Sequence, residues 1–314
     1  MDKAGQTIPY RDIIRKDMTY KWKQVKKHKA QYMFILPYFL IFTTFTVLPV
    51  VISIYLSFTY FNILEVPRFI GLENYFRLFI DDKVFIQSLR NTIVFAVITG
   101  PISYLISLFM AWLINDRRRF SRVFFTVLFY APSLAGGLVA VMQIIFSGDS
   151  YGFLNAMLLR WGLVSDPLLF LQDTRYINAI VIFVVLWGSL GTQFLSFIAG
   201  LQGIDQQYYE AGAIDGVRNR WQELWFITLP LMKPQLIFGA VLSITASFGI
   251  GDIINNLVGF PSKEYVAHTI VLHLQDYGSI RYEMGYASAI ATLLFIIMIV
   301  SNKAIQKLVS KVGT

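Results

Sequence analysis

The sequence contains no cysteine and little charge. Without a thiol, the chain has no disulfide, no thiolate metal site and no cysteine nucleophile. Its charged residues amount to 15%, whereas about a quarter of the residues in a soluble globular domain are charged. Histidine is rare as well, and His268 and His273 are five positions apart. This spacing does not bring both rings to one face of a helix, so no metal site is expected.

Motifs for nucleotide binding and catalysis are also missing. The sequence has no glycine-rich phosphate loop followed by Lys and Ser or Thr. It has no pattern that would bring Ser, His and Asp together for nucleophilic catalysis. We therefore expect a protein that is not an enzyme, with no catalytic residue and no cofactor of its own. Any ATP and Mg²⁺ would be held by partner subunits.

The chain is instead rich in long apolar runs. Hydrophobic residues make up 56% of it, and six runs have about the 20 apolar residues that a helix needs to cross a bilayer. A membrane-spanning β-barrel would show alternating segments of about ten residues instead. The prediction is an all-α, polytopic membrane protein with six transmembrane helices, at 33–58, 91–114, 123–146, 176–200, 235–254 and 286–300 with its continuation to 308.

Lysine and arginine gather on one side of this predicted topology. The basic segment 1–32, the segments 115–122 and 201–234 and the C-terminal residues 301–314 hold 19 of the 27 Lys and Arg residues and 8 of the 19 acidic residues. The positive-inside rule places this side, and with it both termini, in the cytoplasm. The net charge of +8 is thus explained by membrane topology and does not indicate nucleic-acid binding.

A polar loop at 202–234 separates the fourth and fifth apolar runs. Its pattern predicts two short helices joined by a turn. Asp205 is suited to cap the first helix, and Asp215-Gly216 has the composition of a helix end at which glycine adopts a positive φ. The second helix is expected to begin near Trp221 and to end before Pro230.

Small residues and an acid lie together in the first of these helices. The run Tyr209-Glu210-Ala211-Gly212, followed by Asp215-Gly216 and by Ile-Thr-Leu-Pro at 227–230, resembles the EAA loop of bacterial ABC importer permeases, most closely those for carbohydrates. It differs at Gly212, where the family has alanine, and in the ten residues, not nine, between Gly216 and Ile227. The resemblance implies that the coupling residues are Tyr209, Glu210, Ala211, Gly212, Ala213, Asp215 and Gly216. The alternative is an ordinary cytoplasmic loop.

The resemblance extends over the six-span pattern and implies the architecture of a type I ABC importer permease. The chain would then comprise a basic segment (1–32), a permease domain (33–308) with its coupling loop (202–234), and a tail (309–314). The implied partners are a second permease, two ATPase subunits in contact with the loop, an extracellular solute-binding protein and membrane lipids. The implied substrate is a carbohydrate. Because neither the fourth nor the fifth run contains Lys or Arg, we expect a neutral oligosaccharide.

Polar residues inside the fourth and fifth runs are candidates for the substrate pathway. On a continuous helix, positions i, i+3, i+4 and i+7 share a face, and the fourth run has such a stripe at Ser189, Thr192, Gln193 and Ser196. The fifth run has small residues on one face. A second candidate set lies roughly opposite and includes neighbouring amides: Thr245, Phe248, Asp252, Asn255 and Asn256. In permeases similar to this chain, the helices on either side of the coupling loop line the sugar pathway.

Alternatives remain open for these residues and for the function. The stripe in the fourth run can equally join helices by hydrogen bonds, as Ser, Thr and Gln often do in membranes. Asp252 can lie at the outer interface instead of inside the bilayer, where a charge costs about 2.5–3.5 kcal/mol. The chain can carry another small solute, or it can be an ion-coupled secondary transporter. Such transporters often contain inverted repeats and buried ion relays, and neither is evident here.

Three segments lie on the predicted outer side, at 62–90, 147–175 and 255–285. They contain aromatic and turn residues, and we expect them to pack as a small lid. The run 71–75, Gly-Leu-Glu-Asn-Tyr, resembles the GLxNY outer-loop segment of sugar permeases.

Overall fold

The computed structural model describes residues 27–134 and 137–310. Most of the predicted basic segment 1–32 and of the tail 309–314 lies outside the described residues. The chain divides into two compact units between Tyr55 and Leu56.

The first unit consists of one apolar helix. Helix α2 (Lys29–Phe42) continues through a π-helical turn (Thr43–Val47) into α3 (Leu48–Leu56). Together they form a helix of 28 residues that is long and apolar enough to cross a membrane. Pro49 lies inside this continuous helix, just after the π-helical turn Thr43–Val47, where the backbone departs from the regular α-helical hydrogen-bond pattern. The predicted first span is confirmed and begins four residues early, at Lys29.

The second unit begins with a small antiparallel sheet and is otherwise helical. In the sheet, β1 (Thr59–Tyr60) pairs with β2 (Arg68–Phe69) so that Thr59 lies opposite Phe69. The longer helices are α5 (Lys83–Asn115), α6 (Arg119–Leu134), α9 (Thr174–Trp187), α10 (Thr192–Gln202), α14 (Lys233–Phe248) and α17 (Met284–Val309). The shorter ones are α4 (Glu73–Phe76), α7 (Leu138–Ile145), α8 (Phe153–Arg160), α11 (Gln206–Ile214), α12 (Arg220–Glu223), α13 (Leu229–Leu231), α15 (Gly251–Val258) and α16 (Ile270–Gln275). Further helical turns lie at Arg77–Asp81, Leu224–Thr228, Lys263–Tyr265 and Asp276–Ile280.

The all-α membrane fold is confirmed. In the described residues, four helical segments are long and apolar enough to span a bilayer: Lys29–Leu56, Lys83–Asn115, Thr174–Gln202 and Met284–Val309. Two bent pairs bring the number to six. One joins α6 to α7 at 83°, and the other joins Arg220–Leu231 to α14 at 82°.

Two of the helix boundaries that differ from the prediction are explained by local sequence, one by a glycine and one by a capping residue. The span predicted at 235–254 ends at Phe248, and Gly249 separates it from α15. Glycine is a poor helix former, so the chain leaves the helix there at little cost. The second span begins at Lys83 and not at residue 91, because Asp82 Oδ1 accepts a hydrogen bond from the Phe85 amide at 2.8 Å.

Small residues allow close packing of α5, α10 and α14, which contact one another. A Cβ atom on Gly239 would lie 2.4 Å from Cζ of Phe197, so the two helices approach at this position only because glycine is present. Ser243 and Ser247 follow one and two turns later and are buried. This face of α14 is therefore a packing surface, and in a bilayer such contacts are a main source of helix association.

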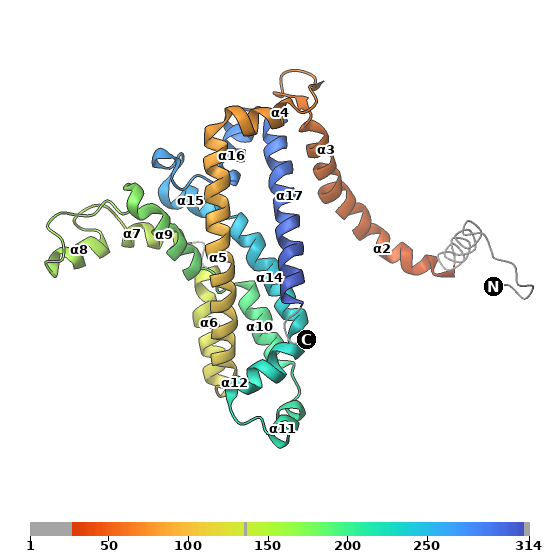
Figure 1. Cartoon of the computed structure of the whole chain (residues 1–314), viewed down its shortest axis with the longest axis vertical. Helices are drawn as coiled ribbons and strands as arrows, with labels where there is room; N and C mark the ends of the chain where they lie inside the picture. The colour runs from red at the N-terminus through yellow and green to blue at the C-terminus, as the bar shows by residue number, and fades with distance from the viewer. Residues whose placement is uncertain (1–26, 135–136, 311–314) are drawn as a thin grey trace, which may run out of the picture. The chain divides into compact units, whose positions relative to one another are not determined.

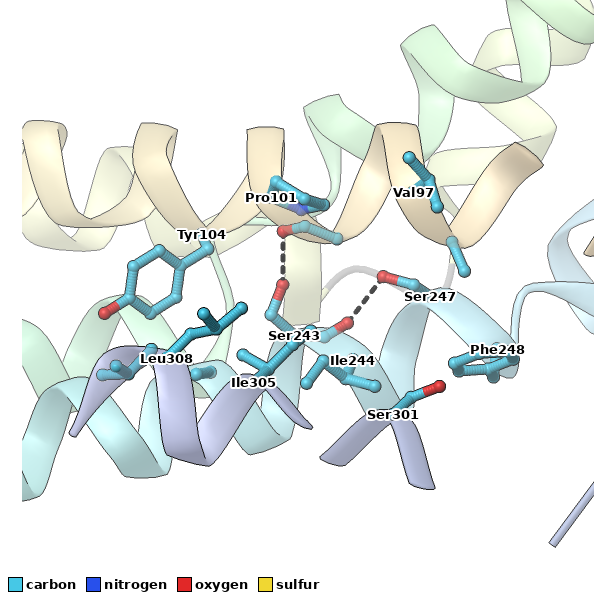
Figure 2. Close-up of a pocket in the computed structure, with 14 residues that line it drawn as sticks. Val97, Pro101, Tyr104, Ser243, Ile244, Ser247, Phe248, Ser301, Ile305 and Leu308 are labelled. Carbon is cyan, nitrogen blue, oxygen red and sulfur yellow. Dashed lines mark hydrogen bonds between the residues drawn. The ribbon is translucent and has the colours of Figure 1, made fainter. Parts of the chain in front are cut away.

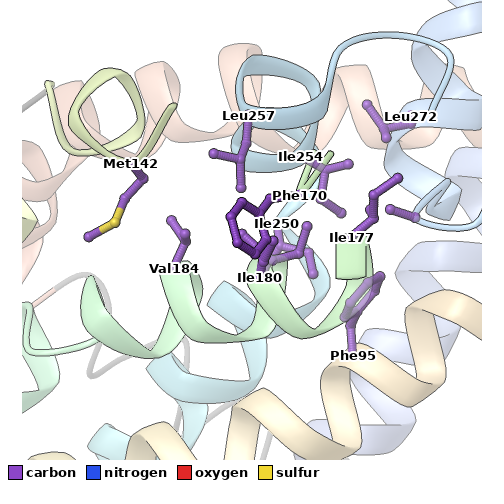
Figure 3. Close-up of a cluster of buried hydrophobic side chains, with 12 residues drawn as sticks. Phe95, Met142, Phe170, Ile177, Ile180, Val184, Ile250, Ile254, Leu257 and Leu272 are labelled. Atoms are coloured by element: carbon purple, nitrogen blue, oxygen red, sulfur yellow. The ribbon is translucent and has the colours of Figure 1, made fainter. Parts of the chain in front are cut away.

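An apolar cluster joins the interrupted helices. Phe95 of α5, Ile177 of α9, Ile254 of α15 and Leu272 of α16 are buried in it together, and Figure 3 shows these side chains converging from their separate elements. This cluster lies toward the end of α5 that carries α4 and α16, whereas α11 lies at the opposite end (Figure 1).

The first and third outer segments contact each other. Gln87 Nε2 donates to the carbonyl oxygens of Glu264 and Tyr265 at 3.0 and 3.1 Å, and Asn91 Nδ2, just inside the second span, donates to those of Tyr265 and His268 at 3.0 and 2.9 Å. Asn74, from the GLxNY-like run, is buried and donates to the carbonyl oxygens of Ser57 and Thr59, both at 2.9 Å. The sequence analysis assigned no role to this asparagine, and in the structure it holds the first outer segment to the backbone at 57–59.

A buried polar cluster joins the start of α5 to α16 and α17. Asp82 Oδ2 accepts from the Tyr286 hydroxyl at 2.8 Å and lies 2.9 Å from His273 Nε2. Burial tends to raise the pKa of Asp82, but the hydrogen bonds from His273, the Phe85 amide and Tyr286 outweigh it and hold the pKa far below its usual range. Near this cluster, His268 is buried with no hydrogen-bond partner for either ring nitrogen among the described residues.

The buried His268 side chain predicts a pH dependence of the stability of the fold. Burial lowers the pKa of His268 to about 4, and His273 makes a smaller contribution in the same direction. The attraction of Asp276 and Asp82 acts in the opposite direction. In the unfolded chain His268 takes up a proton near pH 6.5. Between these values the unfolded state binds the extra proton, so stability should fall as the pH is lowered from about 6.5 to about 4. Thermal unfolding of the purified chain at stepped pH measures this fall, and His268→Leu should flatten it.

The matched control for this pH series is His28→Leu, since His28 is exposed. It should leave the wild-type slope unchanged. An equal slope in wild-type protein and in His268→Leu would show that the buried imidazole does not contribute.

Candidate functional site: a polar loop and a polar cavity

The polar loop is built by local capping, as its sequence predicts. Asp205 Oδ1 accepts from the Gln207 amide at 3.0 Å and begins α11. The helix ends at Ile214, and Gly216 follows with φ of +94°. The amide of Val217 then donates to the carbonyl oxygen of Gly212 at 2.9 Å. Both the predicted cap and the predicted glycine stop are confirmed.

The second helix of the loop is longer than predicted. Asn219 caps it by accepting from the Gln222 amide at 2.9 Å, so it begins at Arg220. It continues through a π-helical turn and then through Pro230 to Leu231. The predicted end before Pro230 is wrong because the proline occupies the first turn of α13, where the missing N–H is tolerated.

The loop has an inner face and an exposed face. On the inner face, the Tyr209 hydroxyl lies 3.0 Å from Thr228 Oγ1, and burial raises the pKa of Tyr209. Gly212 is buried as well, since a Cβ atom on it would lie 2.4 Å from Cδ1 of Ile227. The remaining predicted coupling residues are exposed, namely Glu210, Ala211, Ala213, Asp215 and Gly216. Gly212 therefore packs within the loop and does not widen its exposed small-residue surface.

An aromatic and ionic anchor fixes the loop to the end of α5. Arg220 forms an ion pair with Asp116, and its guanidinium carbon lies 4.7 Å from the centre of the Trp112 ring. The rings of Trp112 and Trp221 are 4.9 Å apart. The sequence analysis missed this anchor, because it treated Asp116 only as a loop charge. The available signal was a single acid at the start of the basic segment 115–122.

A polar cavity of about 450 Å³ lies between α5, α6, α9, α10 and α14. Three of the predicted pathway residues line it: Ser189, Thr192 and Gln193. Five further hydroxyl-bearing residues that the pathway prediction did not include also line it: Thr99, Ser103, Ser133, Ser243 and Ser247. Its lining includes no Lys, Arg, Asp or Glu side chain. The cavity is therefore uncharged, and its eight hydroxyl and amide side chains are set in a lining whose surface is mostly apolar.

The predicted stripe in the fourth run is broken. Because α9 ends at Trp187 and α10 begins at Thr192, Ser189 and Ser196 do not share one regular helix. Gln193 is buried, and its Nε2 donates to Ser107 Oγ at 2.8 Å and to the Ser103 carbonyl oxygen at 3.1 Å. Gln193 thus joins α10 to α5, as the interhelical alternative proposed, while it also lines the cavity.

Most of the second predicted set lies away from the cavity. Asp252 is exposed on α15, beyond the end of α14, and accepts from Gln275 Nε2 at 3.1 Å. Asp252 and Thr245 do not share a face of one continuous helix as predicted, because α14 ends at Phe248 and α15 begins at Gly251. None of the following lines the polar cavity: Ser196, Thr245, Phe248, Asp252, Asn255 and Asn256.

Phe248 instead lines a second, mostly apolar pocket of about 400 Å³ between α5, α14 and α17. Figure 2 shows Ser243 and Ser247 at the edge of this pocket, where Ser243 Oγ donates to the Gly100 carbonyl oxygen and Ser247 Oγ donates to the Ser243 carbonyl oxygen. Since both serines also line the polar cavity, they form part of the wall between the two spaces.

The hydroxyls of the polar cavity present mainly acceptor positions. Ser133 Oγ and Ser189 Oγ each donate to a backbone carbonyl oxygen three residues earlier, both at 2.7 Å. A hydroxyl that donates its own hydrogen in this way retains lone pairs that can accept from a ligand. The wall is therefore suited to bind a molecule that carries hydroxyl donors.

Comparison with known proteins identifies relatives over most of the chain. Residues 103–312 match the family model of the binding-protein-dependent transport system inner membrane component. The chain is 33% identical to a probable ABC transporter permease protein, YesP, of Bacillus subtilis, covering 87% of this chain and 88% of that protein. It is 30% identical to the lactose transport system permease protein LacF of Rhizobium radiobacter, covering 85% and 89%. It is 29% identical to the arabinooligosaccharides transport system permease protein AraP of Bacillus subtilis, covering 91% of each chain.

Solved structures share the fold. A chain of a bacterial ABC transporter involved in the import of the acidic polysaccharide alginate superposes with a TM-score of 0.77 at 21% identity, covering 94% of this chain and all of that one. A chain of a bacterial alginate ABC transporter, in complex with a periplasmic protein bound to an alginate pentasaccharide, gives a TM-score of 0.73 at 24% identity, covering 93% and 99%.

The contact between Gly212 and Ile227 makes a testable prediction. Gly212→Leu should overpack the loop, at a cost of about 1–3 kcal/mol. Hydrogen–deuterium exchange across 206–231 should then rise, and adding Ile227→Ala should restore much of the protection by making room. The matched control is Ala213→Leu at the exposed neighbouring position, which should change exchange little. Equal exchange in the two leucine variants would contradict an internal role for Gly212.

Proposed function

The chain belongs to the family of binding-protein-dependent transport system inner membrane components and is a multi-pass permease of the ABC transporter type, and we propose that it imports a neutral oligosaccharide. In this proposal a second permease completes the pathway, and two ATPase subunits bind the polar loops. An extracellular solute-binding protein delivers the sugar. ATP and Mg²⁺ are held by the ATPase subunits, and hydrolysis takes place there.

The observation that carries the proposal is the connection between the polar loop and the cavity. The exposed face of α11 is tied to the second loop helix through Tyr209 and Thr228. That helix turns by 82° into α14, and α14 lines the cavity with Ser243 and Ser247. In this proposal, a displacement of α11 is transmitted to the cavity wall through the second loop helix and α14.

The proposed cycle uses this route to exchange two states of the cavity. ATP binding draws the two coupling helices of the transporter together, and the pathway opens outward to receive sugar from the binding protein. Hydrolysis and product release return it to the inward-open state. ATP drives this change only because the ATPase pair binds the two states with different affinity.

The cavity chemistry supports a neutral, hydroxyl-rich substrate. Its volume of about 450 Å³ is within the range of about 300–1,000 Å³ common for small-molecule sites. Acceptors at Ser133 and Ser189 match sugar hydroxyls, and the uncharged lining offers no cation to a carboxylate. Two relatives are named for lactose and for arabinooligosaccharides. The structural relatives act on acidic alginate, so the same fold serves substrates of different charge.

The proposed orientation places the polar loop and both termini in the cytoplasm of a bacterial cell. The loop lies at the same end of the second unit as the arginine-rich segment 116–119 and the C-terminal end of α17 (Figure 1). This end carries the basic residues that the positive-inside rule assigns to the cytoplasm. The opposite end, with α4 and α16, would meet the solute-binding protein.

A charge reversal in the loop tests the proposal. Glu210 is exposed on α11, and Glu210→Lys should disturb a contact with the ATPase subunit without disturbing the fold. In proteoliposomes that enclose ATP, with the binding protein and labelled oligosaccharide outside, we expect uptake to fall at least about tenfold, which corresponds to about 1.4 kcal/mol. Membrane insertion and basal ATP hydrolysis should persist.

The matched control is Asp166→Lys, an equal charge reversal at an exposed position between α8 and α9, and it should transport normally. Normal uptake by Glu210→Lys would remove the loop from coupling. Uptake by this chain alone, without ATP and driven by an ion gradient, would instead support a secondary transporter. Preference for a carboxylated sugar over its neutral analogue would contradict the neutral substrate.

A further inference from the structure

A cleft of about 310 Å³ lies between α6 and α10, at the end of the bundle that carries the polar loop. The α6 residues that line it recur every three or four positions and so share one face of that helix. Arginines lie at the start of α6, and residues further along it have short side chains. The lining comprises Arg119, Arg122, Val123, Thr126, Val127, Ile198 and Gln202.

The two arginines of this cleft have no acidic partner. Among residues 27–134 and 137–310, neither Arg119 nor Arg122 takes part in an ion pair. Arg122 Nη1 donates to the Asn115 carbonyl oxygen at 3.4 Å, which uses one of its five N–H donors. Asp116, close by in the sequence, is already paired with Arg220. The cleft therefore concentrates positive charge and planar donor groups of the geometry that suits a phosphate.

The lining becomes apolar one and two turns further along α6. Val123 and Val127 are 56% and 62% exposed although α6 belongs to a membrane-spanning pair. Ile198 of α10 closes the cleft from the other side and is buried. Cationic donors at one end and an apolar wall at the other match an amphiphilic anion better than a free phosphate ion.

We propose that this cleft binds an anionic phospholipid of the inner leaflet. Its phosphate lies between Arg119 and Arg122, and the first part of an acyl chain lies against Val123, Val127 and Ile198. The leaflet follows from the orientation given under the proposed function, because anionic lipids attract basic residues at the cytoplasmic surface. Since Arg122 contacts Asn115, next to the Asp116–Arg220 ion pair, the lipid also braces the anchor of the polar loop.

The test compares two double variants with equal loss of charge. Arg119→Gln/Arg122→Gln removes the arginines of the cleft, and Arg117→Gln/Arg118→Gln removes the two preceding arginines, which do not line it. The chain, purified with its partner subunits in neutral detergent, is titrated with phosphatidylglycerol or with phosphatidylcholine of the same acyl chains, and bound lipid is counted by native mass spectrometry. We expect phosphatidylglycerol affinity to fall at least about tenfold in the cleft variant and less than about twofold in the control.

A third variant and a competitor separate a lipid from a free anion. Val127→Trp fills the apolar part of the cleft and leaves both arginines, so it should weaken phosphatidylglycerol binding several-fold. Millimolar inorganic phosphate should not displace the lipid. Displacement by phosphate, equal losses in both double variants, or unchanged binding in the cleft variant would each overturn the proposal. Loss of a partner subunit from the cleft variant in neutral detergent would also overturn the proposal. It would indicate that a protein surface, and not a lipid, occupies the cleft. Lipid binding in detergent is measured without transport, so its failure is distinct from a failure of the proposed function.

Discussion

The fixed connection of the polar loop to the membrane helices is the constraint on which the rest of the structure depends. The Asp116–Arg220 ion pair and the stacked Trp112 hold the second loop helix against the end of α5. Tyr209 and Thr228, together with Gly212 and Ile227, hold α11 against that helix. These contacts connect α11, through the second loop helix, to the 82° joint with α14. In the proposed function, the loop acts as a lever attached to the wall of the cavity.

The helix interruptions explain why a polar cavity can exist at this depth. Backbone outside a regular helix is tolerated within a bilayer only where it is covered by protein or faces a watery space. The break between α9 and α10 meets this requirement, because Gly188, Ser189 and Gly191 all line the cavity. A Cβ atom on Gly188 would lie 2.8 Å from the Leu138 side chain, so α7 also closes against the break. The same interruption that removes a regular polar stripe thus provides hydroxyl and backbone groups to the cavity.

Sequence analysis predicted what depends on hydropathy and on near neighbours. The six apolar runs, the Asp205 cap and the Gly216 stop were all correct, because each is decided by composition or by residues within a few positions. The helix faces assigned to the candidate pathway residues were wrong, because the prediction assumed continuous helices in the fourth and fifth runs. Hydropathy does not register the breaks between α9 and α10 and at Gly249, so residues on either side of a break were placed on one face. The Asp116–Arg220 pair joins residues about a hundred positions apart, and although Asp116 is the one acid of the segment 115–122, a single sequence does not show with which distant residue it pairs.

The absence of cysteine makes the central claim directly measurable, since Ala211→Cys would carry the only thiol of the chain. Ala211 is exposed on α11, and Tyr151, in the second outer segment, is 95% exposed and provides the opposite-side control as Tyr151→Cys. Each variant is treated with a membrane-impermeant maleimide in intact cells and in inverted membranes. The account predicts that Ala211→Cys is labelled only in inverted membranes, less so when the ATPase subunits are bound, and that Tyr151→Cys is labelled only in intact cells. Labelling of Ala211→Cys in intact cells would contradict both the orientation and the role of the loop in coupling.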